Sequence, residues 1–573
     1  MQKLLTGNEA VARGAYEAGV HFASAYPGTP STEILENLAK YEEIDAQWSP
    51  NEKVALEVAL GASIGGARSI VSMKHVGLNV AADPLFTASY TGVNGGLVIV
   101  SADDPGMYSS QDEQDNRYYA RFAKIPMLEP SDSQEAKDFT AYAFELSEEY
   151  DTPVLLRLTT RISHGRSPVI LGERIERNVK DYNRNIEKYI VLPAHARKLH
   201  IKVEERMSKL RDLAEKSPFN EVQMGDREIG IITCGAAYQY VKEACPNASI
   251  LKLGFSYPVP HGLIKEFSRQ VKRLIVVEEL EPLLENEIRA LGIKVEGKEL
   301  FTRFGELSTE IVRKGLGMEE QKTAEPVENI PLRPPVLCPG CPHRGVFYQL
   351  NRLKAVVTGD IGCYTLGALP PLSSMDTCHC MGASIGAALG LEKARGKEFA
   401  RKVVAVIGDS TFLHSGITGL MDVVYNKGTI TVVILDNGTT AMTGHQHHPG
   451  TGYTAKNMPT SKVDLENICR AVGVKRVVTV DPYDLESVGA VLKEEMAVEE
   501  PSVVISRRPC VLMLKEKESA FAVGERCIGC GACVRLGCPA VSMKGAAAEI
   551  NIQLCSGCGL CAQVCPNKAI EKK

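Results

Sequence analysis

Short apolar runs alternate with longer amphipathic stretches along most of this chain. Apolar runs with the length of buried strands lie at 96–101, 153–158, 229–234, 273–278, 403–407 and 431–435. Stretches with apolar residues at helical spacing lie at 9–18, 53–62 and 415–426. Strands that alternate with helices predict α/β domains with mainly parallel sheets, which bind ligands at the carboxyl ends of the strands.

Breaks in this pattern divide the chain into six parts. A charged, weakly periodic segment with a helix over 194–215 separates the first two α/β regions, and a segment rich in proline and charge precedes the third. We expect α/β domains at 1–180, 229–316 and 336–515, a connecting arm at 181–228, a linker at 317–335, and a small cysteine-rich α+β domain at 516–573.

Composition narrows the class of protein. A length of 573 residues with 44% hydrophobic and 24% charged residues is ordinary for three or four globular domains. The net charge is −5 and no basic run stands out, so we expect no nucleic-acid partner. No apolar stretch reaches the ~18–20 residues of a membrane span, and the N-terminus lacks the apolar core of a signal peptide. We therefore expect a cytoplasmic protein in a reducing, low-oxygen cell.

The cysteine-rich tail carries the strongest chemical signal. Eight of the 17 cysteines form two copies of one motif, each of which ends in Cys-Pro. In two-cluster ferredoxins, the fourth cysteine of each copy binds the other copy's 4Fe–4S cluster. This rule assigns cluster one to Cys527, Cys530, Cys533 and Cys565, and cluster two to Cys555, Cys558, Cys561 and Cys538.

Two features qualify this assignment. The first copy has one extra residue before Cys538, so the loop around cluster two departs from the usual pattern. Zinc knuckles or disulfides are the alternative, although the Cys-Pro ending of both copies favours iron–sulfur clusters.

The third α/β region has a pattern that suits a diphosphate and a magnesium ion. Gly408-Asp409-Ser410 follows one apolar strand, and Asn437 and Thr439 follow the next. The Asp409 carboxylate, the Asn437 side-chain oxygen and the Thr439 carbonyl are hard oxygen ligands of the kind that Mg2+ prefers.

Residues around this motif extend the predicted site. The glycine-rich helix start at Gly382 and Ser384 is a candidate contact for the diphosphate. His445, His447 and His448 follow the metal motif and are either substrate contacts or exposed loop residues. Two ordinary strand-end turns and a tightly packed helix are the alternative for the whole region.

The spaced pair resembles the motif of the thiamine-diphosphate enzymes, with Ser410 and Asp436 as departures from it. In that class a glutamate from another domain hydrogen-bonds to the aminopyrimidine ring. The resemblance assigns this role to Glu52, which starts an alanine-rich helix, with Glu57 as the second choice. Without the resemblance, Glu52 is an ordinary acidic residue in the first helical turn.

Tyr26-Pro-Gly-Thr29-Pro-Ser resembles a signature of the 2-oxoacid:ferredoxin oxidoreductases. The resemblance implies that Thr29 helps to hold the 2-oxoacid. Arg117 is a candidate partner for the substrate carboxylate, because a guanidinium can bind a carboxylate through two hydrogen bonds. A surface ion pair is the alternative for Arg117, which follows several acidic residues.

Further cysteines resemble the elements that hold a proximal cluster in related oxidoreductases. These elements are Cys338-Pro-Gly-Cys341, Gly-Cys363 and Pro-Cys510, and they imply a possible third 4Fe–4S cluster. Cys378 and Cys380 are rival ligands, and a cofactor pocket without metal is the alternative.

The resemblance to the 2-oxoacid:ferredoxin oxidoreductases covers essentially the whole chain. It implies three-layer α/β thiamine-diphosphate domains followed by a two-cluster ferredoxin-like domain. The domain order implies oxidative decarboxylation of an aryl pyruvate such as indole-3-pyruvate, with coenzyme A as acyl acceptor and ferredoxin as electron acceptor. It also implies a smaller beta subunit in an α2β2 assembly. Pyruvate or 2-oxoglutarate specificity remains open, and a non-redox thiamine-dependent decarboxylase is a weaker alternative.

Overall fold

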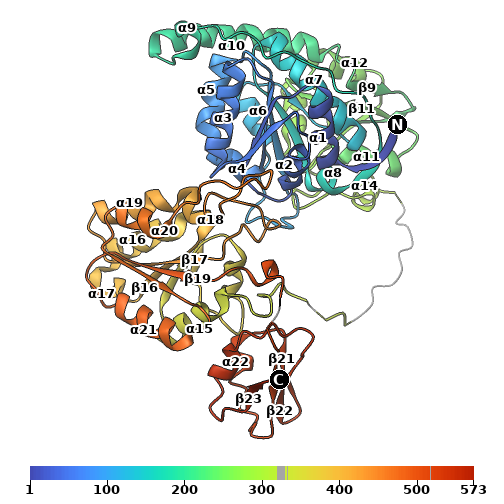
Figure 1. Ribbon diagram of the computed structural model, residues 1–573. Coiled ribbons are helices and arrows are strands. Elements are labelled where there is room, and N and C mark those ends of the chain that lie inside the picture. Colours follow the sequence, from blue (N-terminus) through green and yellow to red (C-terminus); the bar gives the residue numbers. More distant parts are fainter. Residues whose placement is uncertain (319–328, 332, 517) are drawn as a thin grey trace. The chain divides into compact units, whose positions relative to one another are not determined.

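The computed structural model describes residues 1–318, 329–331, 333–516 and 518–573 (Figure 1). The chain forms two compact units, 1–326 and 327–573. Most of the predicted linker lies outside the described residues.

The first unit is built around a seven-stranded sheet in the order β12-β6-β7-β5-β4-β2-β3. All neighbours pair in parallel except the edge strand β12, which pairs antiparallel with β6. The strands are β2 (Phe22–Ala25), β3 (Asp45–Trp48), β4 (Ser69–Lys74), β5 (Leu97–Asp103), β6 (Met127–Leu128), β7 (Val154–Thr159) and β12 (Phe255–Tyr257).

Helices cover both faces of this sheet, because its central strands are apolar on both sides. In β5, Val98 and Val100 belong to the core that contains residues of α1, α2 and α7, whereas Leu97 and Ile99 face the core of α3, α5 and α6. The helices are α1 (Gly7–Glu17), α2 (Thr32–Leu38), α3 (Glu52–Ile64), α4 (His75–Val80), α5 (Ala82–Thr91), α6 (Arg117–Ala123), α7 (Ser133–Tyr150) and α8 (Thr160–His164).

A second, four-stranded sheet in the same unit has the order β13-β10-β11-β9. It consists of β9 (Asn220–Gln223), β10 (Asp226–Thr233), β11 (Ala248–Leu253) and β13 (Arg273–Val277), with helices α11 (Ala237–Ala244), α12 (His261–Ser268), α13 (Leu283–Ala290) and α14 (Thr309–Gly315). The edge strand β12 of the first sheet comes from this same stretch of chain, so the first two predicted domains share a sheet.

The predicted helix of the connecting arm is confirmed as α10 (Pro193–Ala214), which follows the short α9 (Ile186–Tyr189). Val203, Met207 and Leu210 of α10 are buried in the core of the first sheet. A small antiparallel pair, β1 (Gln2–Thr6) and β8 (Arg166–Ile170), completes the unit.

The second unit contains a six-stranded parallel sheet in the order β15-β14-β16-β17-β19-β18. Its strands are β14 (Val356–Gly359), β15 (Thr377–Cys378), β16 (Val403–Gly408), β17 (Thr431–Asp436), β18 (Arg476–Val480) and β19 (Ser502–Arg507). The main helices are α15 (His343–Leu353), α16 (Ala383–Arg395), α19 (Ile417–Tyr425), α20 (Leu465–Ala471) and α21 (Leu485–Glu495).

The two faces of strand β16 contribute to two different hydrophobic cores, as those of β5 do in the first unit. Ala405 and Ile407 pack with residues of α16, α19 and α20, and Val404 and Val406 pack with residues of α15 and α21. The result is a three-layer α/β domain, as the sequence predicts.

The tail folds as a small α+β domain within the second unit (Figure 1). It contains the antiparallel pairs β20 (Phe521–Val523) with β23 (Ile570–Lys572) and β21 (Val541–Lys544) with β22 (Ala547–Ile550), and the helix α22 (Leu560–Gln563). Leu485 of α21 joins its core. The predicted α/β fold class with a ferredoxin-like tail is confirmed. Within the described ranges, no helix is both long and apolar enough to cross a membrane.

Candidate functional site

Glu52 is the first residue of α3, and only 5% of it is exposed. The side chain of Asn51 caps this helix by accepting a backbone hydrogen bond at 2.9 Å. The Glu52 carboxyl group lies against Gly77 of α4, where a Cβ atom would stand 2.6 Å from Oε1 of Glu52. Glu57 is instead exposed and paired with Lys53. Of the two candidates for the catalytic glutamate, Glu52 is therefore buried and Glu57 is not.

Thr29 and Lys74 lie at the carboxyl ends of the adjacent parallel strands β2 and β4. Thr29 is half-buried, and its carbonyl accepts a hydrogen bond from the Ser109 hydroxyl at 3.4 Å. Lys74 packs against the loop that carries Gly28 and Thr29, since a Cβ atom on Gly28 would stand 3.0 Å from the Cβ atom of Lys74. The ammonium group donates to the Ser109 carbonyl at 2.6 Å. Sequence reasoning missed this buried cation.

The electrostatic surroundings of Lys74 connect it with Glu52. Burial lowers the pKa of Lys74, while the carboxylates of Asp104, Asp112 and Glu52 work in the opposite direction. A buried ammonium group therefore shares its surroundings with the predicted catalytic glutamate.

Arg117 is fully buried at the start of α6. Its guanidinium donates to both carboxylate oxygens of Asp115, at 2.9 and 2.6 Å, and to Glu278 at 2.6 Å. It also donates to the carbonyls of Glu279 and Glu281, at 2.9 and 2.8 Å. These bonds connect a loop of the first sheet with the segment after β13. They use all three guanidinium nitrogens of Arg117. The arrangement does not support the predicted contact with a substrate carboxylate.

The two halves of the predicted metal motif meet in the structure. Asp409 and Asn437 follow the adjacent parallel strands β16 and β17, and both are buried. Asp409 accepts hydrogen bonds from the amides of Ser410 and Gly438, each at 2.8 Å. Thr439 is buried beside them, and its amide lies 3.4 Å from the Asn437 side-chain oxygen. A carboxylate and amide oxygens in one buried place fit the ligands that Mg2+ prefers.

His448 faces this motif. Its Nε2 atom lies 3.4 Å from the carboxylate of Asp409, and its side chain is buried. Burial works to raise the pKa of Asp409, but attraction to His448 and the two amide bonds outweigh it and lower the pKa. Asp409 is therefore ionised at neutral pH, as a cation ligand must be. Of the two alternatives for the loop histidines, the exposed-loop interpretation does not describe His448.

Gly408 leaves room for an aromatic ring. A Cβ atom on Gly408 would stand 2.7 Å from the ring of Tyr364, and one on Gly362 would stand 2.3 Å from the same ring. The Tyr364 hydroxyl donates to the carbonyl of Ile361 at 3.0 Å. The two glycines thus let Tyr364 hold the loop that leads to Cys363.

Gly382 and Ser384 stand at the start of α16, as the sequence predicts. Their amides donate to the buried carboxylate of Asp360, at 2.8 and 3.1 Å. The predicted diphosphate contact through these amides is therefore not supported. Asp360 lies in the loop after β14, and its position after an apolar strand was the available signal for it.

The four cysteines of the predicted third cluster, called the inner group below, are neighbours in the structure. Burial raises the pKa of Cys341 to about 12 and that of Cys363 to about 11, and repulsion from the other thiols of this group adds to both. Burial likewise raises the pKa of Cys510, with a contribution from Cys338. These electrostatic contacts connect Cys338, Cys341, Cys363 and Cys510 in one group.

The neighbours that shift the pKa of the two rival cysteines are not members of this group. Burial raises the pKa of both Cys378 and Cys380, and the neighbours that add to these shifts are Asp360 and, for Cys378, Cys380. The Cys378 thiol lies 3.5 Å from the Asp360 carbonyl. The electrostatic neighbours of the thiols therefore group the predicted set of four and do not include its rivals.

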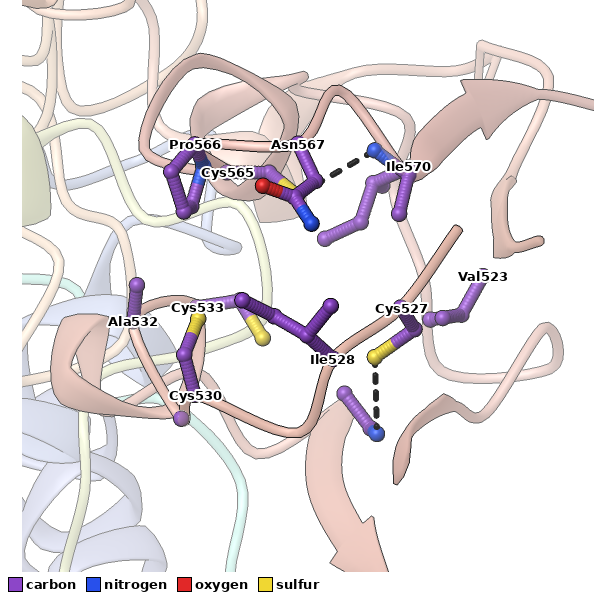
Figure 2. Close-up of a pocket in the computed structure, with 13 residues that line it drawn as sticks. Val523, Cys527, Ile528, Cys530, Ala532, Cys533, Cys565, Pro566, Asn567 and Ile570 are labelled. Carbon is purple, nitrogen blue, oxygen red and sulfur yellow. Dashed lines mark hydrogen bonds between the residues drawn. The ribbon is translucent and has the colours of Figure 1, made fainter. Parts of the chain in front are cut away.

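The four cysteines assigned to cluster one line a single cavity, and Figure 2 shows their side chains around it. Backbone amides reach two of the sulfurs: Ala548 donates to Cys527 at 3.5 Å, and Ala569 donates to Cys565 at 3.2 Å. Hydrogen bonds from the Ala548 and Gly529 amides lower the pKa of Cys527, which favours the thiolate that binds iron.

The four cysteines assigned to cluster two line a second cavity. Cys538 is among them, so the extra residue before it does not remove it from the group. A short helical turn (Val534–Leu536) and Gly537, with a φ of +69°, accommodate the longer loop. The cavity is also lined by Pro339 and Gly340, which lie between two cysteines of the inner group.

Across the described parts of the chain, no three His, Cys, Asp or Glu side chains approach closely enough to hold one metal ion. Zinc knuckles place all their ligands around one ion, whereas the cysteines of a 4Fe–4S cluster bind different iron atoms.

Three sequence families match the chain. Residues 13–206 match "Pyruvate flavodoxin/ferredoxin oxidoreductase, thiamine diP-bdg", and residues 360–506 match "Thiamine pyrophosphate enzyme, C-terminal TPP binding domain". Residues 520–566 match "4Fe-4S dicluster domain". These matches and the relatives below define a thiamine-diphosphate-binding oxidoreductase of the 2-oxoacid:ferredoxin type.

Curated relatives narrow the class. The chain is 43% identical to "Indolepyruvate oxidoreductase subunit IorA" of Pyrococcus horikoshii, over 99% of this chain and 96% of the relative. It is also 43% identical to the proteins of that name from Archaeoglobus fulgidus and Methanothermobacter thermautotrophicus, over 99% of this chain and 97% of each relative. The chain belongs to this family of indolepyruvate oxidoreductase IorA subunits, and the family resemblance found in the sequence is confirmed.

Proposed function

We propose that this chain, with a smaller partner subunit, oxidatively decarboxylates indole-3-pyruvate and related aryl pyruvates. The products are CO2 and, with coenzyme A, the aryl-acetyl-CoA, and the electrons pass to an external ferredoxin. Family membership over almost the full length supports this reaction. The observation that carries it is that one chain combines matches to thiamine-diphosphate domains with two cavities of four cysteines each.

Thiamine diphosphate and Mg2+ are the proposed cofactors of the α/β domains. Bound thiamine diphosphate supplies a carbon nucleophile and an electron sink. Asp409, Asn437 and the Thr439 carbonyl would hold Mg2+, because they offer buried oxygen atoms and an ionised carboxylate. Glu52 would hydrogen-bond to the aminopyrimidine ring from its buried place against Gly77.

Thr29 and Lys74 are the proposed contacts of the keto acid. An ammonium group has three N–H donors, and one of those on Lys74 bonds to the Ser109 carbonyl. Lys74 can therefore take the carboxylate-binding role that the buried network of Arg117 does not support.

Three 4Fe–4S clusters form the proposed electron path. The inner cluster would bind Cys338, Cys341, Cys363 and Cys510, and the two outer clusters would fill the cavities of the tail. Pro339 and Gly340 support a direct route, since they belong to the inner cysteine loop and line the cavity of cluster two. Clusters need reduced thiols, so we place the enzyme in the cytoplasm.

Six functional parts follow from this assignment. We propose pyrimidine-binding (1–180), connecting (181–228), transketolase C-terminal-like (229–316), linker (317–335), diphosphate-binding (336–515) and two-cluster (516–573) parts, in an α2β2 assembly.

A substrate panel tests the proposed reaction. The chain and its partner subunit are assayed without oxygen, with coenzyme A, a viologen dye, and indolepyruvate, phenylpyruvate, pyruvate or 2-oxoglutarate. Indolepyruvate should give the highest kcat/KM. A higher value for pyruvate or 2-oxoglutarate would reassign the substrate, and CO2 release without dye reduction would indicate a non-redox decarboxylase.

A pair of variants tests the role of Glu52. Glu52→Gln should keep thiamine diphosphate bound and lose about 10²–10⁴-fold in turnover. Glu57→Gln changes an exposed glutamate of the same helix and should keep full activity. Full activity of Glu52→Gln would remove this residue from the mechanism.

A further inference from the structure

Arg344 connects the inner cysteine loop with the ferredoxin-like tail. It lies in α15, and only 2% of it is exposed. One terminal nitrogen donates to the carbonyls of Leu337 and Cys338, at 2.7 and 3.1 Å. The other donates to the carbonyl of Leu536 at 2.7 Å, two residues before Cys538. The guanidinium therefore bridges the two cysteine-bearing segments.

The same side chain lines the cavity of cluster two, among Cys538, Cys555, Cys558 and Cys561. Its Nε–H group is buried and has no acceptor among the described protein atoms. An N–H group left without a partner in a protein interior carries an unfavourable desolvation free energy. A cluster in this cavity would offer sulfur atoms as acceptors.

The charge of Arg344 also lacks a nearby counterion. The three acceptors of its terminal nitrogens are neutral carbonyls. Within the part of the chain that the structure describes, no carboxylate lies at ion-pair distance from it. A buried cation without a carboxylate partner is costly, unless a group of opposite charge lies beside it. A cluster with four thiolate ligands is such a group.

We propose that Arg344 raises the reduction potential of cluster two by placing its positive charge and its Nε–H donor beside the cluster. Reduction adds one electron to the cluster and makes it more negative, so a cation and an N–H···S hydrogen bond favour the reduced form. Cluster two then accepts electrons readily from the inner site that Arg344 also contacts. This inference rests on the cluster ligands proposed above, but not on the proposed reaction.

Redox titration of the full-length protein tests the effect. Electrons come from dithionite, and reduction is followed by electron paramagnetic resonance. Arg344→Gln should lower the equilibrium constant for reduction of one cluster at least tenfold. For a one-electron reduction this is a fall of ~59 mV in the reduction potential. Arg344→Lys keeps the charge but lacks Nε, and it should lower the potential less.

Arg352→Gln is the matched control. Arg352 belongs to the same helix α15, but it is exposed and is not among the residues that line either cysteine cavity. This variant should keep all cluster potentials. An unchanged potential in Arg344→Gln, or an equal fall in Arg352→Gln, would overturn the proposal.

A measurement on the wild-type protein covers the case in which the variants lose the cluster. Protein labelled with 15N only in the arginine guanidinium groups is reduced with dithionite, and pulsed electron paramagnetic resonance detects nitrogen nuclei near the unpaired electron. Arg344 is the only arginine that lines either described cysteine cavity. A 15N coupling is expected, and its absence would contradict the proposed contact. Because dithionite replaces the keto acid, neither experiment depends on the substrate.

Discussion

Gly77 and Glu52 share one space, because a Cβ atom on Gly77 would stand 2.6 Å from Oε1 of Glu52 and 2.7 Å from its Cγ. The glycine is part of α4, and the glutamate begins α3. The position of the proposed catalytic carboxylate therefore depends on a residue 25 positions later in the chain.

Gly77→Ala should displace the Glu52 carboxylate and lower kcat about 10²-fold, since small displacements at an active site have effects of this size. Gly61→Ala is the control, because no atom lies within 4 Å of a Cβ placed there. Steady-state kinetics with the partner subunit measure both. Equal activity of the two variants would show that Gly77 does not position Glu52.

Arg117 and Lys74 should respond differently to substitution. Arg117→Met removes the cation that bridges the buried Asp115 and Glu278 and should cost about 3–5 kcal/mol in the free energy of unfolding. Lys74→Met should raise KM for the keto acid about ten- to a hundredfold, the value of a charge-assisted hydrogen bond. Denaturant titration and kinetics separate the two effects. A stable Arg117→Met with raised KM would restore the original prediction for Arg117.

Glu279 should make stability depend on pH. Burial raises the pKa of Glu279 to about 7, above the ordinary value of 4.5. The folded protein therefore keeps a proton that the unfolded chain releases, and the free energy of unfolding falls as the pH rises from about 4.5 to about 7. The contribution is ~3 kcal/mol at most.

Glu279→Gln removes this titration, so its stability relative to the wild type should increase between pH 5 and pH 8. Denaturant titrations at the two pH values measure the difference. Glu281→Gln changes an exposed glutamate two residues away and should show no such increase. An equal response of both variants would refute the assignment to Glu279.

Iron content tests the inner cluster. A Cys341→Ala/Cys363→Ala double variant of the full chain should contain about four fewer iron atoms than the wild type, which should hold about twelve in three clusters. The Cys378→Ala/Cys380→Ala variant changes the rival pair and should keep them. Equal iron in wild type and first variant would exclude a cluster at these cysteines.

Local features of the fold could be predicted from the sequence. The apolar run at 153–158 forms β7 (Val154–Thr159), and the predicted helix over 194–215 forms α10 (Pro193–Ala214). The spacing of apolar residues predicts such elements because it shows which face of the helix or strand is buried. The two cysteine groups of the tail could also be predicted from the sequence, because regular spacing within one short segment brings the ligands together.

Partners that are distant in the sequence could not be predicted. Arg117 pairs with the nearby Asp115, but nothing in the surrounding sequence indicates its second carboxylate partner, Glu278, which lies 161 residues later. The amides of Gly382 and Ser384 suggested an anion, but Asp360 of the same protein already accepts their hydrogen bonds. In both cases the sequence identifies a donor group, but only the folded chain identifies its acceptor.

The most direct test of the central claim is the redox state of the clusters after addition of the keto acid. The protein is purified without oxygen with its partner subunit, thiamine diphosphate and Mg2+, and visible absorbance is recorded as indolepyruvate and coenzyme A are added. The account predicts that the iron–sulfur absorbance bleaches in the wild type and remains in Glu52→Gln. An unchanged spectrum in a wild-type protein whose clusters dithionite can reduce would contradict it.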